Sequence, residues 1–102
     1  VEASASAMFV YALFKGVNCG YLDESMREAA RRGYNGIMEH FVAVGADGQI
    51  HLNGICSMAG LGKYKEDMEY RDGSYTYYIS EPVVADDYKG VGPFIMACTE
   101  YK

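Results

Sequence analysis

The chain has 102 residues, of which 50% are hydrophobic and 23% are charged, with a formal net charge of −5. This length suits one domain and is too short for two. The hydrophobic share argues against disorder, and the acidic balance argues against a nucleic-acid partner. No apolar run approaches the ~20 residues that cross a bilayer. We therefore expect a folded domain that binds neither nucleic acid nor membrane.

The cysteines Cys19, Cys56 and Cys98 are odd in number and widely spaced, and no CxxC pair occurs. This pattern predicts neither a disulfide framework nor a zinc site. We expect three reduced, mostly buried thiols. The start of the chain lacks both Met and a signal-peptide pattern and enters a helix pattern directly. We therefore expect residues to precede it in a cytoplasmic protein.

The first predicted helix runs from Ser4 to Lys15, with Ser4 as its cap and Gly16 as its stop. Apolar residues recur at i, i+3, i+4, i+7 and i+8, and they are Ala5, Met8, Phe9, Ala12 and Leu13. Further apolar residues fill the other side. A helix that is apolar nearly all round is expected to be buried on several sides.

The second predicted helix runs from Glu24 to Ala43, with Asp23 as its N-cap. Gly33 lies inside its apolar stripe, although glycine costs about 1 kcal/mol in a helix. That position predicts the close approach of a neighbouring helix. Because the link between the two helices is short, we expect an antiparallel helical hairpin.

The remaining elements are shorter. Residues 45–48 predict a turn, and the alternation over Gln49–Asn53 predicts a short strand. Gly54–Gly73 is a long loop of a kind that is uncommon in compact domains and typical of binding. Tyr75–Ile79 could be extended. A final helix is predicted over Phe94–Tyr101.

Several side chains are candidates for chemistry. The carboxyl groups of Glu81, Asp86 and Asp87 could do acid–base work, or they could serve as solvated or capping groups in turns. His51 and Cys56 are two potential metal ligands without a third, so no metal is expected.

Four tyrosines of the tail could stack on sugar rings, or they could pack in a core or an interface. They are Tyr70, Tyr75, Tyr77 and Tyr78.

Four stretches together resemble the C-terminal portion of the unsaturated rhamnogalacturonyl hydrolases, glycoside hydrolase family 105, which are similar to the unsaturated glucuronyl hydrolases of family 88. The stretches are SASAMFVYALFKGV, GYLDESMREAARRGYNGIMEHFV, DGQIHLNGICSMAGLG and RDGSYTYYISEPVVADDYKGVGPF. They follow in order along nearly the whole chain. The combination is specific, whereas each piece alone would be weak.

The resemblance implies a mainly α fold. Residues 1–102 would be the C-terminal part of a single (α/α)6 six-hairpin barrel domain, with a small β excursion and a long loop. The rest of the barrel would lie upstream and would be a necessary partner. Alone, this part is expected to be inactive.

The resemblance also implies a reaction in bacterial pectin degradation. Family members hydrate the C4=C5 double bond of an unsaturated galacturonyl residue linked to rhamnose, and they need no metal or other cofactor. An aspartic acid donates the proton, and it lies in the upstream part. We therefore assign no catalytic residue to this chain.

By position, the resemblance places Lys89, Gly90, Val91 and Gly92 in a substrate-binding loop before the last helix, where Pro93 would be the first helical residue. Lys89 could hold the substrate carboxylate as a point charge. The glycines permit close backbone approach, and N–H groups at a helix start suit an anion.

Two alternatives remain open at this point. One is a stand-alone carbohydrate-binding or interaction module. The other is an unsaturated glucuronyl hydrolase that acts on glycosaminoglycan fragments. The residues of the chain do not decide the substrate.

Overall fold

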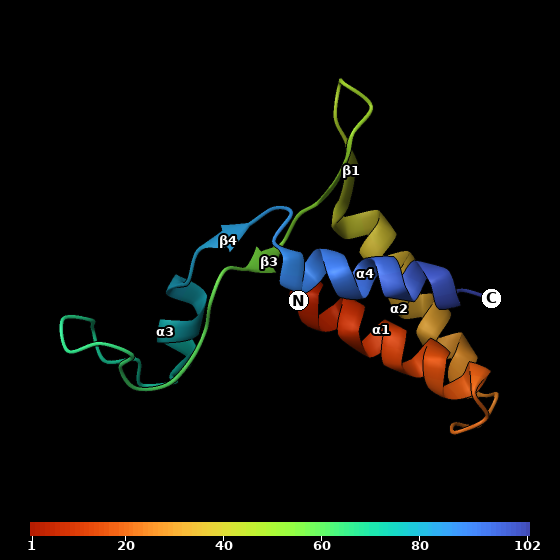
Figure 1. Cartoon of the computed structure of the whole chain (residues 1–102), viewed down its shortest axis with the longest axis horizontal. Coiled ribbons are helices and arrows are strands. Elements are labelled where there is room, and N and C mark those ends of the chain that lie inside the picture. The colour runs from red at the N-terminus through yellow and green to blue at the C-terminus, as the bar shows by residue number, and fades with distance from the viewer.

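The computed structural model describes all residues from Val1 to Lys102. Three helices pack together, a β-hairpin stands off from them, and a long loop with a short helix lies to one side (Figure 1). The predicted mainly α class is confirmed. In chain order the elements are α1 (Ala3–Asn18), α2 (Met26–His40), β1 (Val42–Val44), β2 (Ile50–Leu52), β3 (Ile55–Cys56), α3 (Tyr75–Ser80), β4 (Val83–Val84) and α4 (Tyr88–Glu100).

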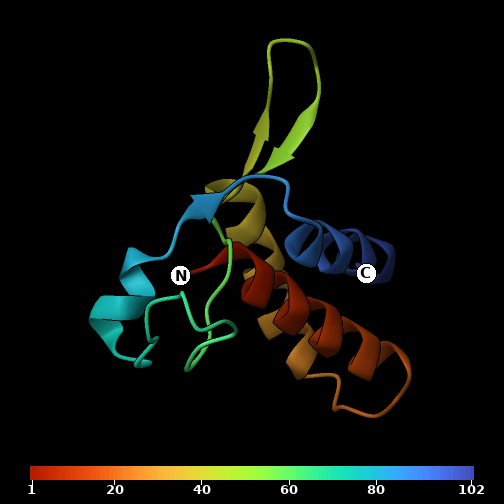
Figure 2. The same cartoon turned by 60° about the vertical axis from the view of Figure 1, so that its left-hand side comes forward.

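Helix α1 is the centre of the packing, because it contacts both α2 and α4 (Figure 2). Small side chains dominate the shared core and let the helices approach closely. Phe14 is fully buried and meets the rings of Tyr34 and Tyr101 edge-on. The core consists of Ala3, Ala7, Val10, Phe14, Ala30, Ile37, Leu52, Ile55 and Ala97.

Burial on several sides was predicted for α1, but this chain buries one side of it. Met8 and Phe9 are 47% and 71% exposed, whereas Val10 and Phe14 on the other side are buried. The helix was apolar on both sides, so periodicity could not tell which side would meet α2 and α4. Its cap is Glu2 rather than Ser4, since the Glu2 carboxylate accepts hydrogen bonds from two backbone N–H groups of the first turn.

The ends of the first two helices also differ from the prediction. Helix α1 continues past Gly16 to Asn18, and the left-handed residue that follows is Gly20, with φ of 74°. Helix α2 begins at Met26, and Asp23 instead accepts a hydrogen bond from the Ser25 N–H in the preceding turn.

The hairpin of α1 and α2 itself is confirmed, and so is the role of Gly33. A Cβ at Gly33 would lie 2.7 Å from Val10 Cγ2. Helix α2 ends at His40 instead of Ala43. The cause is strand pairing, because Val42–Val44 pairs antiparallel with Ile50–Leu52, with Val42 opposite Leu52.

The strand and turn predictions around residue 48 are confirmed in outline. The Gly45 N–H donates to Gln49 O at 2.8 Å, and Gly48 has φ of 81°. Of the two apolar strand residues, Leu52 is buried while Ile50 is 69% exposed. A second small sheet pairs β3 with β4, with Ile55 opposite Val84.

Two predictions for the tail were wrong. Tyr75–Ser80 is helical rather than extended, because the Ser74 hydroxyl caps the Tyr77 N–H at 3.1 Å. Helix α4 begins at Tyr88 instead of Phe94 and holds Pro93 in its interior. Asp87 caps it.

The three cysteines are free thiols, as predicted, but they are not mostly buried. Cys19 and Cys98 are exposed, and Cys56 is half-buried. Cys19 follows the end of α1, and Cys98 lies beside Tyr34, with its sulfur 3.6 Å from the phenol oxygen. None of the helices combines the length and the apolar character that a membrane crossing requires.

Candidate functional site

The predicted loop Lys89–Gly92 forms the first turns of α4. The Lys89 N–H donates to Asp87 Oδ1 at 3.0 Å. The N–H groups of Gly90 and Val91 both donate to the Asp87 carbonyl oxygen. The carboxylate of Asp87 therefore already lies where an anion was expected at the helix start.

The two glycines of this stretch have different surroundings. Gly90 is buried, and a Cβ there would lie 2.6 Å from Ile55 Cδ1 and 3.4 Å from Ser4 Cβ. No atom lies within 4 Å of a Cβ at Gly92. Gly90 thus serves the packing of α4 on α1 and β3, and its contact with a substrate stays a prediction.

Lys89 spans the gap between α4 and the loop that follows β3. Its ammonium group donates to the backbone oxygen of Ser57 at 2.8 Å and lies 3.6 Å from Asp87 Oδ1. The side chain remains 39% exposed. This ammonium is held at the surface with donors to spare, which is compatible with a carboxylate ligand.

Asp86 joins the β-hairpin to the start of α4. It is the one non-glycine residue with positive φ, at 59°. Its N–H donates to Leu52 O at 2.9 Å, and its Oδ1 accepts from the Leu52 N–H at 2.8 Å. Asp86 therefore pairs with Leu52 much as a strand residue would.

The second oxygen of Asp86 faces His51, whose Nδ1 lies 2.7 Å away. The Asp86 carboxylate raises the pKa of His51, and His51 and the Leu52 N–H lower the pKa of Asp86. His51 is thus paired with a carboxylate rather than with Cys56. Asp87 fills the capping role that was the alternative to acid–base work, whereas Asp86 is held by hydrogen bonds to Leu52 and His51.

The long loop and α3 make a separate layer of polar contacts, which we call the arm (residues 57–82). The Tyr77 hydroxyl accepts a hydrogen bond from the Gly60 N–H at 3.1 Å. Glu81 beside it raises the pKa of the Tyr77 phenol. Arg71 is buried beneath the same loop. Sequence reasoning missed Arg71, because nothing around it marks it as buried.

The other tail tyrosines are not core residues. Tyr70, Tyr75 and Tyr78 are 71%, 77% and 45% exposed. Within this chain these three tyrosines pack in no core. Packing in an interface and stacking on a sugar both stay predictions.

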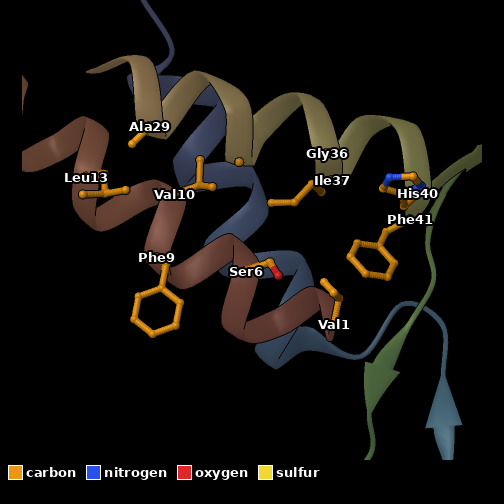
Figure 3. Close-up of a pocket in the computed structure, with 11 residues that line it drawn as sticks. Val1, Ser6, Phe9, Val10, Leu13, Ala29, Gly36, Ile37, His40 and Phe41 are labelled. Carbon is orange, nitrogen blue, oxygen red and sulfur yellow. The ribbon is translucent and has the colours of Figure 1, made fainter. Parts of the chain in front are cut away.

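An apolar groove of about 330 Å³ lies between α1 and α2 (Figure 3). Phe9 and Leu13 of α1 line it from one helix, and Ile37 and Phe41 line it from the other. Ser6 and His40 are its polar side chains. No carboxylate lines the groove.

Comparison with known proteins gives the chain its family. The model of Glycosyl Hydrolase Family 88 matches residues 1–102. The chain therefore belongs to this family, and the resemblance seen in the sequence is confirmed. A solved structure described as a glycoside hydrolase from family 105 of C. acetobutylicum is 52% identical, with a TM-score of 0.90 over 99% of the chain.

Two curated relatives are 44% identical over 97% of the chain. They are the protein Atu3128 of Agrobacterium fabrum and a 24.9 kDa protein in the picA locus of Rhizobium radiobacter. The chain spans 43% of the length of these relatives and 27% of the solved structure.

Proposed function

We propose that the chain is the C-terminal part of an enzyme that acts on unsaturated galacturonyl-rhamnose oligosaccharides from pectin. The observation that carries the proposal is the family match over residues 1–102, together with 52% identity to a glycoside hydrolase from family 105. The remainder of an (α/α)6 barrel would supply most of the cleft. The exposed apolar face of α1 is consistent with such a neighbour.

The proposed reaction is hydration of the C4=C5 double bond. A carboxylic acid gives a proton to C4, a water molecule adds its oxygen to C5, and the proton that the water loses returns to the carboxylate. The hemiketal then opens, and the bond to rhamnose breaks. A carboxyl group that donates a proton at neutral pH needs a raised pKa.

Six carboxyl groups of this chain have a pKa below the ordinary value, because hydrogen bonds stabilise their carboxylate form. These groups are Glu2, Asp23, Glu24, Asp72, Asp86 and Glu100. A lowered pKa makes these six groups poor proton donors at neutral pH.

In this proposal Lys89 contributes to binding. Its half-exposed ammonium would exchange the Ser57 carbonyl or the Asp87 carboxylate for the carboxylate of the substrate. A lysine in this role acts as a point charge and improves binding without taking part in bond breaking.

The test uses the complete protein that contains these residues and the unsaturated galacturonyl-rhamnose disaccharide. We expect the ultraviolet absorbance of the double bond to fall while rhamnose is released. Lys89→Ala should raise KM with little change in kcat, and Lys63→Ala, an exposed lysine of the arm, is the control. No turnover of this disaccharide, or turnover only of unsaturated glucuronyl glycosaminoglycan fragments, would reject the substrate. An unchanged KM would reject the role of Lys89.

A further inference from the structure

Arg71 is the buried cation of this chain. Its exposed fraction is 6%, and the other buried polar residue is the uncharged Ser4. Arg71 forms no ion pair with any Asp or Glu, although six other ion pairs occur in the chain. A buried charge is costly to desolvate and is normally paired. No carboxylate therefore lies within ion-pair distance of the Arg71 guanidinium.

The contacts of Arg71 fix its orientation without neutralising it. Nε donates to Gly62 O at 3.0 Å, and Nη2 donates to Leu61 O at 3.1 Å. The Tyr64 ring covers one face of the guanidinium, 4.1 Å from its central carbon. A guanidinium group that is held by two carbonyl oxygens and one aromatic ring is pre-organised for a ligand, because the side chain has little rotamer freedom left to lose on binding.

One nitrogen of Arg71 remains available. Nη1 has no hydrogen-bond acceptor in the chain, and no fully buried side-chain nitrogen or oxygen lacks a partner. Nη1 is therefore not fully buried, and it lies beside Gly60. Arg71 lines a cavity of about 280 Å³ on the arm.

The other walls of this cavity restrict what can bind. Tyr70 and Tyr77 offer aromatic faces, which suit the apolar C–H surface of a sugar. Ser80, Glu69 and Glu81 offer acceptors for hydroxyl groups. A small bare anion would meet two carboxylates here and be repelled. A ligand with one carboxylate and several hydroxyl groups would place the carboxylate on Arg71 and donate from its hydroxyl groups to Ser80, Glu69 and Glu81.

We propose that Arg71 binds the carboxylate of a uronic acid residue through Nη1, in a cavity whose carboxylates accept the hydroxyl groups of the same sugar. This site lies on the arm and does not include Lys89. It rests on the proposed function for its ligand class, since acidic pectin oligosaccharides consist of such residues. It would hold a uronate of the oligosaccharide and takes no part in the reaction.

The test follows the Nε–H signal of Arg71 by NMR in the complete protein grown with isotope-labelled arginine. The signal is assigned by its absence in Arg71→Met. We expect saturable shifts with galacturonate, and none at the same concentrations with galactose. Galacturonamide should bind at least about tenfold more weakly, because it keeps the shape of the sugar and lacks the charge. This comparison changes the ligand and leaves the fold of the protein intact.

Protein variants separate this proposal from the proposed function. Lys89→Met should leave the Arg71 response to galacturonate unchanged. Arg71→Lys keeps the positive charge but loses the planar guanidinium with its fixed N–H donors. The affinity of this variant for galacturonate, measured from the amide signals of the arm, should fall. Equal affinity for galacturonate and galacturonamide, or no saturable shift of Arg71, overturns the inference whatever the enzyme does. An Arg71 response without turnover of the disaccharide supports the inference and rejects the proposed function.

Discussion

The helical body (α1, α2 and α4) and the arm are held together by different forces. In the body, Phe14 and Ile37 are at most 1% exposed and pack against alanines. In the arm, α3 buries none of its residues, and the loop is ordered by hydrogen bonds such as the Gly62–Arg71 bridge. Figure 1 shows the arm lying apart from the three helices.

This difference separates scaffold from candidate site. Apolar burial is non-directional and gives the body its stability. Hydrogen bonds of a loop contribute little net stability but place polar groups with defined directions. The arm therefore carries the polar groups of Arg71 and Tyr77 on a loop, and loops on rigid scaffolds commonly carry binding residues. The body supplies a surface that the arm is anchored to through β3 and β4.

The largest effect is expected from Phe14→Ala in the body. Phe14 is fully buried at the centre of the ring cluster, so its removal leaves a cavity and should lower the free energy of unfolding by about 3–5 kcal/mol. The control is Phe9→Ala on the same helix, where the side chain is 71% exposed. Urea unfolding measures both, and equal losses would contradict the assignment of the buried face.

Next in size is a pair of substitutions in α4. Gly90→Ala drives a methyl group toward Ile55 Cδ1, 2.6 Å away, and should destabilise by about 1–3 kcal/mol. Gly92→Ala meets no atom within 4 Å and should stabilise the helix by up to about 1 kcal/mol. Thermal unfolding of the two variants should therefore shift in opposite directions. The same direction for both would show that α4 does not pack on β3 as described.

A smaller and local effect is expected from Tyr77→Phe in the arm. The change removes the acceptor of the Gly60 N–H, so amide exchange at Gly60 should become several-fold faster. Amides of α1 should exchange as before, because they do not depend on the arm. Tyr78→Phe is the matched control, since its hydroxyl bonds to no group of the chain. Faster exchange throughout α1 would instead mean that body and arm open together.

The smallest effect is expected from His51→Gln at the link between hairpin and α4. Asp86 and, more weakly, Asp47 raise the pKa of His51 above 6.5. The contribution of charged His51 to the stability of the folded state is therefore complete below pH 6.5, and it is lost as the pH rises through the raised pKa. The pKa of Asp86 lies below 3.8. Its contribution to the stability of the folded state is therefore complete above pH 3.8, and it is lost as the pH falls through the lowered pKa. Both side chains are half-exposed, so the effect is small.

The variant should therefore lose more stability at about pH 5 than at about pH 8. Urea unfolding at the two values measures the difference. The control is His40→Gln, whose ring is 67% exposed and lies 4.0 Å from Glu39. A loss from His51→Gln that is the same at both pH values would mean that the histidine acts by packing alone.

Apolar periodicity predicted the helical body well where the apolar residues of a helix lie on one side only. The hairpin of α1 and α2 and the close contact at Gly33 follow from apolar spacing along α2. In α1 both sides were apolar, and only the placement of α2 and α4 decides that Val10 faces inward.

The tail was harder to predict because local preference and tertiary context disagree there. The tyrosines of Tyr75–Ser80 favour a strand, yet the Ser74 cap starts a helix. Gly90, Gly92 and Pro93 disfavour a helix, but Gly90 gains contact with Ile55 in return. The burial of Arg71 depends on where Gly60 and Leu61 fold back, which no spacing in the sequence records.

Pro93 divides α4 into two parts that are held by different contacts. Because proline has no N–H, the carbonyl of Lys89 cannot receive the bond that a helix would normally direct to it. The turn that carries Lys89 is nevertheless held in place, because Gly90 is buried against Ile55 and the Lys89 ammonium donates to Ser57 O. Beyond Pro93 the helix is held by Phe94, whose ring stacks on Tyr34. The missing backbone bond at Lys89 is thus offset by contacts outside the helix on both sides of the proline.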